Sequence, residues 1–196
     1  MATVCVFCAA SESIDARYLE AAAEVGRELA RRGHDLVTGG GSVSSMGAVS
    51  RAARAGGART LGVIPEALLA YEVADTGADE LIVTTDMRVR KGIMDERSDA
   101  FVALPGGIGT LEELAEQLTW IQLGRHGKPL VIADIGGFWR PLLTLFAHMR
   151  QEGFIRSGYE MRYLVAERVE DVIPMILSAA AHARPGVAEA EIAKRF

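Results

Sequence analysis

The sequence predicts an α/β protein built on a parallel sheet with helices on both faces. Short apolar runs of strand length alternate along the chain with longer stretches in which apolar residues recur at helical spacing. Two of the short runs end in glycine-rich turns that lead directly into helical stretches. The 196 residues are enough for one domain of ordinary size and too few for two. A single sheet with covered faces follows from this alternation.

Each predicted strand is a short apolar run, and each predicted helix is an amphipathic stretch. The strands are expected near residues 3–8, 35–38, 60–64, 80–84, 100–104, 129–134 and 163–166. The helices are expected near residues 15–32, 46–56, 87–98, 111–124, 139–151 and 169–181. Asp15 and Pro141 lie near helix starts, where such residues are favoured, and Gly33 follows a last turn rich in arginine. We expect one domain over residues 1–181 and a frayed C-terminal extension over residues 182–196.

Composition and charge exclude several classes of protein. Hydrophobic residues make up 49% and charged residues 24%, a globular balance that excludes a disordered chain. The net charge of -5 comes without a basic stripe, so nucleic acid is not an expected partner. The longest apolar runs, such as Val4 to Ala10, are far below the roughly 18 residues of a membrane span. The chain also starts without a secretory pattern, so we expect a cytoplasmic protein that binds no membrane.

The cysteine and histidine positions favour neither a redox site nor a metal site. Cys5 and Cys8 have the C-x-x-C spacing of redox motifs, but they fall in a predicted strand. Strand residues three apart point to opposite faces, so we interpret both as buried thiols. We expect no metal ion, because the four histidines are scattered, without carboxylates at metal-ligand spacing. They are His34, His126, His148 and His182.

The two glycine-rich turns are the strongest signs of a ligand site. They run from Thr38 to Gly47 and from Leu104 to Glu113. In doubly wound sheets such turns let the backbone approach a phosphate, which N–H groups at the helix start bind. Neither turn has the dinucleotide motif G-x-G-x-x-G, because Ser44 and Glu112 occupy the last glycine position, and neither is a P-loop or a serine-hydrolase elbow. Phosphate binding is favoured over turns that serve the backbone alone.

Two charged residues near these turns each have a structural and a functional interpretation. Thr110-x-x-Glu113 has the spacing of a capping box, in which both side chains bond N–H groups at a helix start. The same carboxylate would lie beside a phosphosugar held by the turn. Arg90, in the basic segment 86–91, belongs either to a solvated turn or to a clamp for an anionic substrate. Spacing alone favours the structural interpretation of both residues.

Three motifs together resemble one family. They are the glycine triplet 39–41 with Ser42 and Gly47, the segment Met87-x-x-Arg90-Lys91, and Pro105-Gly106-Gly107-x-Gly109-Thr110-x-Glu112-Glu113. From about Val4 to about Ile176 the chain is similar to the Lonely Guy proteins, the cytokinin riboside 5'-monophosphate phosphoribohydrolases, whose relatives are often labelled possible lysine decarboxylases. The resemblance implies a Rossmann-like, usually dimeric hydrolase without a cofactor. Its reaction would cleave the N-glycosidic bond of an adenine-type nucleoside 5'-monophosphate into free base and ribose 5-phosphate.

The resemblance also implies roles for individual residues, with Arg90 and Glu113 as the catalytic pair. The implied substrate contacts are Gly41, Ser42, Glu72, Lys91, Gly107, Ile108, Gly109, Thr110, Leu111 and Thr119. Glycosidic cleavage passes through an oxocarbenium-like state, so Glu113 is expected to stabilise positive charge on the ribose and to activate water. The 5'-phosphate is expected on the N–H groups of residues 107–110, while Arg90 orients the nucleotide and assists the departing base.

Departures from the family pattern leave the substrate choice open. Many members have Gly-Leu where this chain has Ser44-Ser45, and plant members have Tyr where it has Ile108. Both N6-modified AMP and AMP are therefore retained as substrates. The alternatives are a nucleotide-binding protein without catalysis and a general purine nucleoside 5'-monophosphate nucleosidase. Lysine decarboxylation is disfavoured, because a pyridoxal enzyme needs a suitably placed lysine. The three lysines are Lys91, in the basic segment, Lys128, before a proline, and Lys194, in the tail.

Overall fold

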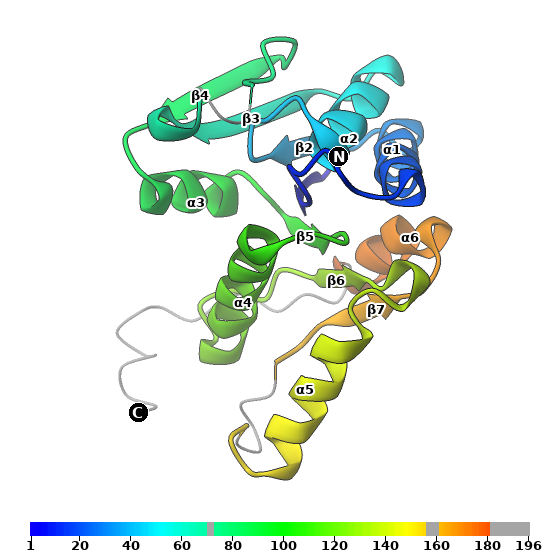
Figure 1. Cartoon of the computed structure of the whole chain (residues 1–196), viewed down its shortest axis with the longest axis vertical. Coiled ribbons are helices and arrows are strands. Elements are labelled where there is room, and N and C mark those ends of the chain that lie inside the picture. Colours follow the sequence, from blue (N-terminus) through cyan, green and yellow to red (C-terminus); the bar gives the residue numbers. More distant parts are fainter. Residues whose placement is uncertain (70–72, 156–160, 181–196) are drawn as a thin grey trace.

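The protein is built on one parallel sheet of seven strands, in the order β4-β3-β2-β1-β5-β6-β7 (Figure 1). The computed structural model describes residues 1–69, 73–155 and 161–180. The strands are β1 (Thr3–Phe7), β2 (Asp35–Thr38), β3 (Thr60–Pro65), β4 (Glu80–Thr84), β5 (Ala100–Ala103), β6 (Leu130–Ala133) and β7 (Leu164–Ala166). All six neighbouring pairs are parallel, which confirms the predicted sheet and each predicted strand.

Helices cover both faces of the sheet, as the alternation of runs predicts. They are α1 (Ala16–Arg31), α2 (Ser44–Ala55), α3 (Met87–Glu96), α4 (Ile108–Leu123), α5 (Arg140–Gln151) and α6 (Val169–Ala180). One buried cluster joins the sheet to α1, α2 and α6, and a second joins it to α3, α4 and α5 (Figure 1). The fold is therefore doubly wound, and its core has two apolar layers separated by the strands.

Most helix ends follow the sequence signals. Asp15 is the N-cap of α1 and accepts a hydrogen bond from the Arg17 N–H at 2.9 Å, and Pro141 lies in the first turn of α5. Gly33, just past α1, has a φ of 69°, a conformation that glycine adopts without strain. Helix α4 begins at Ile108, three residues before its predicted start, and the cause of this difference bears on the site.

Cys5 and Cys8 are buried, form no disulfide and lie on opposite faces of the sheet, as predicted. Burial, with the nearby Glu113 carboxylate, raises the pKa of the Cys5 thiol well above its ordinary value. A thiol of this kind is a poor nucleophile, so it serves the core. Within the described ranges, no helix combines the length and apolar character needed to cross a membrane. The extension expected over residues 182–196 lies outside the described residues.

Candidate active site

Both glycine-rich turns lie at the carboxyl edge of the sheet, on either side of the end of β1. The first follows β2 and the second follows β5, and these two strands are the neighbours of β1. The strand order reverses at this point, because the chain moves outward from β1 in one direction as far as β4 and then returns to its other side. Ligands of doubly wound folds bind at such a switch point.

The first turn approaches the side chain of Arg90 so closely that a side chain on Gly39 would displace the guanidinium. A Cβ at Gly39 would lie 2.0 Å from Nη2 of Arg90, and Gly40 has a φ of 81° against the backbone of β3. The N–H of Gly41 points to the Met46 sulfur at 3.0 Å. These glycines therefore do more than turn the chain, because the turn forms one wall around the Arg90 guanidinium.

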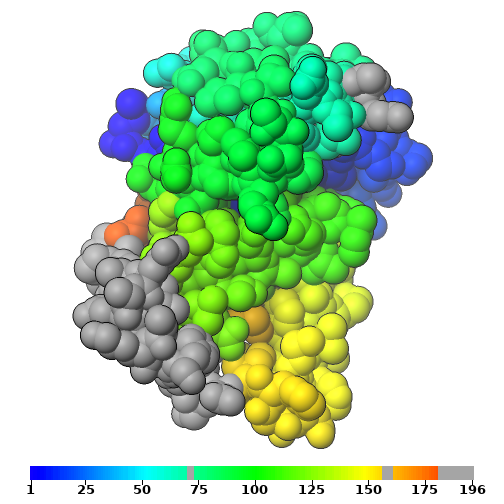
Figure 2. Space-filling view, turned by 90° about the vertical axis from the view of Figure 1, so that its left-hand side faces the viewer, coloured from blue at the N-terminus to red at the C-terminus, as the bar shows by residue number. Residues whose placement is uncertain are grey.

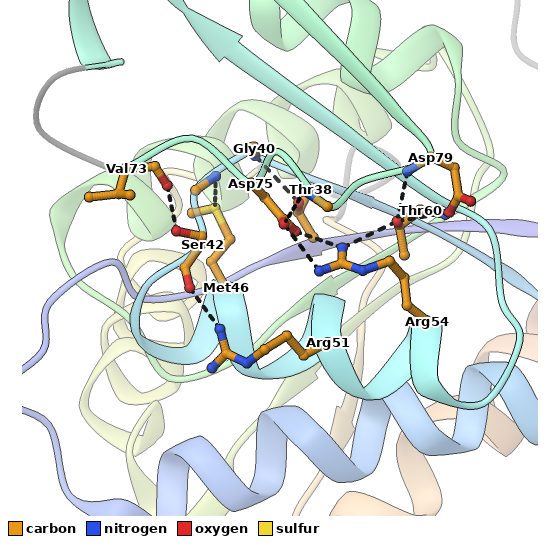
Figure 3. A network of polar contacts seen from close by, with 12 residues as sticks. Thr38, Gly40, Ser42, Met46, Arg51, Arg54, Thr60, Val73, Asp75 and Asp79 are labelled. Carbon is orange, nitrogen blue, oxygen red and sulfur yellow. Dashed lines mark hydrogen bonds and ion pairs between the residues drawn. The ribbon is translucent and has the colours of Figure 1, made fainter.

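Gly41 and Ser42 hold the segment Val73–Asp75 against this turn (Figure 3). The carbonyl of Val73 accepts from the Ser42 N–H at 2.9 Å and from its hydroxyl at 2.6 Å. Asp75 donates its N–H to the Gly40 carbonyl at 2.8 Å, and its carboxylate binds Arg54 at 2.7 and 3.1 Å. The predicted substrate contact Glu72 precedes this segment and lies outside the described residues.

Arg90 is buried, and its guanidinium has two protein partners. Asp86 caps the start of α3, accepting from the N–H groups of the next turn, and so fixes the helix that carries Arg90. Nε donates to the Val63 carbonyl at 2.9 Å, and Nη1 donates to Oε1 of Glu113 at 2.7 Å. The solvated-turn interpretation holds for the exposed Arg88 and is wrong for Arg90, which is only 5% exposed.

The capping box expected at Thr110 and Glu113 is wrong. Gly107, in extended conformation, is the N-cap of α4 and offers no side chain for capping. The helix therefore begins at Ile108, which places Thr110 within the first turn and Glu113 in the second. A Cβ at Gly106 would lie 2.2 Å from the Thr110 hydroxyl, so the preceding turn packs directly on that side chain. Glu113 is thus released from capping and turns to Arg90.

The start of α4 provides backbone donors beside this buried pair. The N–H groups of Ile108, Gly109 and Thr110 belong to the first turn, where an α-helix has no acceptor of its own. Leu111 is the first residue whose N–H bonds within the helix, to the Gly107 carbonyl at 3.0 Å. The Ile108 side chain is 82% exposed and leaves this turn open to solvent. An anion bound here would lie one turn from the Glu113 carboxylate.

Lys91 lies on the neighbouring seam between α3 and α4. Its ammonium binds Glu116 at 3.1 Å and also Glu112. Burial alone would lower the pKa of Lys91, but the two carboxylates raise it above its ordinary value, so the side chain stays charged. Thr119, another implied contact, does not lie at the turn that begins α4. It is exposed on α4, bonds the Ala115 carbonyl, and lies about 14 Å along the helix from Thr110.

Sequence reasoning missed the groups that hold Arg90 and the segment Val73–Asp75 in place. The Val63 carbonyl is a backbone group with no signature in the sequence, and the Arg54–Asp75 pair joins residues 21 positions apart. Gly39 did carry a signal, the glycine triplet, although its spacing gave no indication of which side chain it admits. A hollow of about 620 Å³ lies at the opposite edge of the sheet, and none of the predicted site residues lines it.

The sheet is doubly wound and has glycine turns on both sides of its switch point. One of these turns leads into a helix start that is open to an anion, with a buried carboxylate beside it. These features define a nucleotide-type binding fold. The comparisons with known proteins place it further. The chain belongs to the family described as "Possible lysine decarboxylase", whose model matches residues 46–176. Its relatives include the cytokinin riboside 5'-monophosphate phosphoribohydrolases, which confirms the resemblance to the Lonely Guy proteins.

Two relatives and one solved structure illustrate the match. The phosphoribohydrolase of Mycobacterium tuberculosis is 49% identical over 171 residues, covering 87% of this chain and 91% of that protein. The rice enzyme LOG is 46% identical over 170 residues, covering 87% and 70%. The molybdenum cofactor carrier protein of Chlamydomonas reinhardtii has the same fold, with a TM-score of 0.71, 25% identity and coverage of 92% and 98%. One fold thus carries both hydrolase and carrier names.

Proposed function

We propose that the protein hydrolyses the N-glycosidic bond of cytokinin riboside 5'-monophosphates, that is N6-modified AMP, and of AMP, releasing free base and ribose 5-phosphate. The observation that carries this proposal is the buried 2.7 Å contact between Arg90 and Glu113 at the start of α4. The relatives named above carry the same activity in their names. A carrier would need the phosphate site but has no evident use for a buried, oriented carboxylate beside it.

In the proposed mechanism, the 5'-phosphate binds the N–H groups of Ile108, Gly109 and Thr110, and the positive end of the α4 dipole favours its charge. This anchor places the ribose near Glu113. As the glycosidic bond lengthens, positive charge develops on the ribose ring and the Glu113 carboxylate stabilises it. Water then adds its oxygen to the anomeric carbon, the bond electrons leave with the base, and the one proton that the water loses passes by way of Glu113 to the base. Glu113 assists by accepting a proton from that water.

Arg90 keeps the carboxylate ionised and oriented in this mechanism. Its hydrogen bond to Glu113 favours the charged form, and its second bond, to the Val63 carbonyl, fixes the guanidinium. Nη2 faces the first glycine turn at Gly39, where it is available to the nucleotide. Gly41, Ser42, Lys91 and Leu111 border this region and are proposed to shape it, and Glu72 remains a proposed contact.

We further propose a cytoplasmic homodimer. Large apolar side chains are exposed on α3, α4 and α5, at Met87, Val89, Ile108 and Leu145. Helices α3 and α4 lie together on the face seen in Figure 2, which gives a second copy a surface to cover. Thr119 is exposed and lies far from the glycine turn of its own chain, so in a dimer it would be available to the site of the other copy. Neither cysteine forms a disulfide, which suits a reducing compartment.

The proposal is tested by chromatographic detection of free base after incubation of the purified protein with AMP, isopentenyladenosine monophosphate and the matching nucleoside. We expect base from the monophosphates only, and their relative rates separate cytokinin activation from general purine salvage. Nucleotide binding without base release would instead support a binding protein. Light scattering on the same sample measures the oligomeric state, and a monomer at assay concentration would contradict the dimer.

A further inference from the structure

His126 is a buried titratable residue that the proposed mechanism leaves without a role. It lies in the connection from α4 to β6 and is only 7% exposed. Its ring packs against Phe101 of β5 at a centroid distance of 5.7 Å and meets Trp120 edge-on at 6.3 Å. An imidazole held this tightly has a fixed orientation, so each ring nitrogen has a defined partner.

The two ring nitrogens require one particular tautomer. Nε2 lies 2.9 Å from the amide oxygen of Gln117, which can only accept, so Nε2 carries the proton. Nδ1 accepts a hydrogen bond from the Lys128 backbone N–H at 3.3 Å, so it carries none. A protonated ring would place two donors against each other at Nδ1. The neutral Nε2–H form is the one that satisfies both contacts.

These contacts join the two helices that carry the catalytic pair. Gln117 lies one turn after Glu113 on the same buried face of α4. Asp95 lies in the last turn of α3, which carries Arg90, and its Oδ1 is 3.9 Å from His126 Nε2. Lys128, two residues beyond His126, binds the Asp95 carboxylate at 3.0 Å and its carbonyl at 2.6 Å. The connection therefore holds α3 and α4 from one side.

The narrow seam between α3 and α4 runs directly from the contacts of His126 and Lys128 to the candidate active site. It is lined by Met94, Glu113 and Gln117 and is too tight to admit water. A change in the spacing of the two helices at Gln117 is therefore transmitted to Glu113, one turn away. Resting on the function proposed above, we propose that His126 is a positioning residue, whose neutral ring sets the spacing of α3 and α4 and hence the contact between Arg90 and Glu113.

The charges around His126 favour the same protonation state. Burial lowers its pKa to about 4, and the cations Lys128 and Arg125 act in the same direction, against the opposing effect of Asp95. Lys128 and Asp95 neutralise each other at 3.0 Å, which limits the attraction of the carboxylate for a second cation. The ring is therefore neutral at physiological pH, as its two hydrogen bonds require.

Steady-state kinetics of three variants test the proposal. His126→Phe keeps an aromatic ring and removes both polar contacts, so kcat is expected to fall about tenfold or more, because small misplacements of catalytic groups are costly, while KM changes little. His126→Gln carries an amide N–H that reaches the Gln117 oxygen, and it should restore most of kcat. Phe146→Leu, in the same apolar layer on α5, is the matched control, with lower melting temperature and unchanged kcat.

Unchanged kcat in His126→Phe, or equal losses in His126→Phe and His126→Gln, would overturn the positioning role. A loss of kcat in Phe146→Leu that parallels its loss of stability would do the same. Nitrogen-15 NMR of the wild-type ring provides a readout that does not depend on turnover. The Nε2–H tautomer is expected at neutral pH, and an Nδ1–H or charged ring would contradict the positioning role proposed for His126. Absence of base release by the wild type would instead refute the proposed function.

Discussion

Arg90 Nη1 donates a hydrogen bond to Glu113 Oε1 at 2.7 Å inside the protein, where the two residues are 5% and 8% exposed. They come from different helices, α3 and α4, 23 positions apart. Removing one member of a buried ion pair leaves the other charge without compensation, which is strongly destabilising. Stability and activity are therefore linked at this point, and variants of the pair must be designed to separate the two.

Glu113→Gln makes this separation, since the amide oxygen still accepts from Arg90 while the negative charge is lost. We expect turnover to fall about 100-fold or more, because neither charge stabilisation nor proton acceptance remains. The free energy of unfolding should fall by about 2 kcal/mol, as Arg90 keeps its bond without its counter-charge. Base release and urea unfolding measure the two effects.

The neighbouring Glu112 provides the matched control for this variant. It is exposed on the same helix and binds Lys91, so Glu112→Gln makes the same charge change without touching the buried pair. Its free energy of unfolding should change by less than about 1 kcal/mol, as for other surface pairs. Near-normal turnover in Glu113→Gln would contradict the catalytic role of the carboxylate.

Gly39→Ala tests whether the first glycine turn positions Arg90. The added methyl would lie 2.0 Å from Nη2, so the guanidinium must move away from its place between Val63 and Glu113. Turnover should fall about tenfold or more, and stability by about 1–3 kcal/mol. Gly92→Ala, on α3 with nothing within 4 Å of the new methyl, is the control and should stabilise the helix by roughly 0.5–1 kcal/mol. Full activity in Gly39→Ala would show that Arg90 tolerates displacement.

The sequence predicts the strands and the positions of the two glycine-rich turns well, because both depend on local pattern. Apolar runs define β1 to β7 within about a residue, and the turns after β2 and β5 fall where the switch point places them. The resemblance to a family, rather than spacing, pointed to Arg90 and Glu113. Spacing alone favoured a solvated turn and a capping box, and the structure contradicts both of these for Arg90 and Glu113.

What the sequence could not predict is set by contacts between distant segments. The start of α4 depends on the extended conformation of Gly107. A three-residue shift in that start moves Thr110 into the first turn and Glu113 into the second, so that neither forms the predicted cap. The partner of Arg90 Nε is a backbone carbonyl 27 positions away, and that of Ser42 lies 31 positions away, at Val73. Neither pairing leaves a trace in local periodicity.

Ser44, at the start of α2, has a backbone conformation that is uncommon for a residue with a side chain. It has a φ of 53°, in the left-handed region that glycine adopts freely. Ser44→Gly and Ser44→Ala both lose the hydrogen bond to the Ser11 carbonyl, so their difference isolates the backbone term. We expect the glycine variant to be more stable by about 1 kcal/mol, the reverse of the usual order in a helix.

Comparison of the wild type with Ala48→Gly gives the ordinary order of alanine and glycine stability within the same helix, because Ala48 has no positive φ. There glycine should cost roughly 0.5–1 kcal/mol, as in an ordinary helix interior. Thermal unfolding of all four proteins measures the two differences. Alanine more stable than glycine at position 44 would mean that the left-handed conformation carries no strain.

The burial of His126 predicts how the stability of the fold depends on pH. Its pKa is lowered from 6.5 to about 4 in the folded protein, chiefly by burial. Between these values the unfolded chain binds a proton at residue 126 and the folded chain does not, so stability falls as the pH falls through this window. The neutral His126 contributes up to about 3 kcal/mol to the free energy of unfolding, present above pH 6.5 and lost toward pH 4.

His126→Gln has no group at this position that takes up a proton, so its unfolding free energy should fall less than that of the wild type between pH 7 and 4. Phe146→Leu keeps the histidine and should keep the wild-type slope, which urea unfolding at a series of pH values measures. Parallel pH profiles for the wild type and His126→Gln would mean that the folded protein accepts the proton as readily as the unfolded chain.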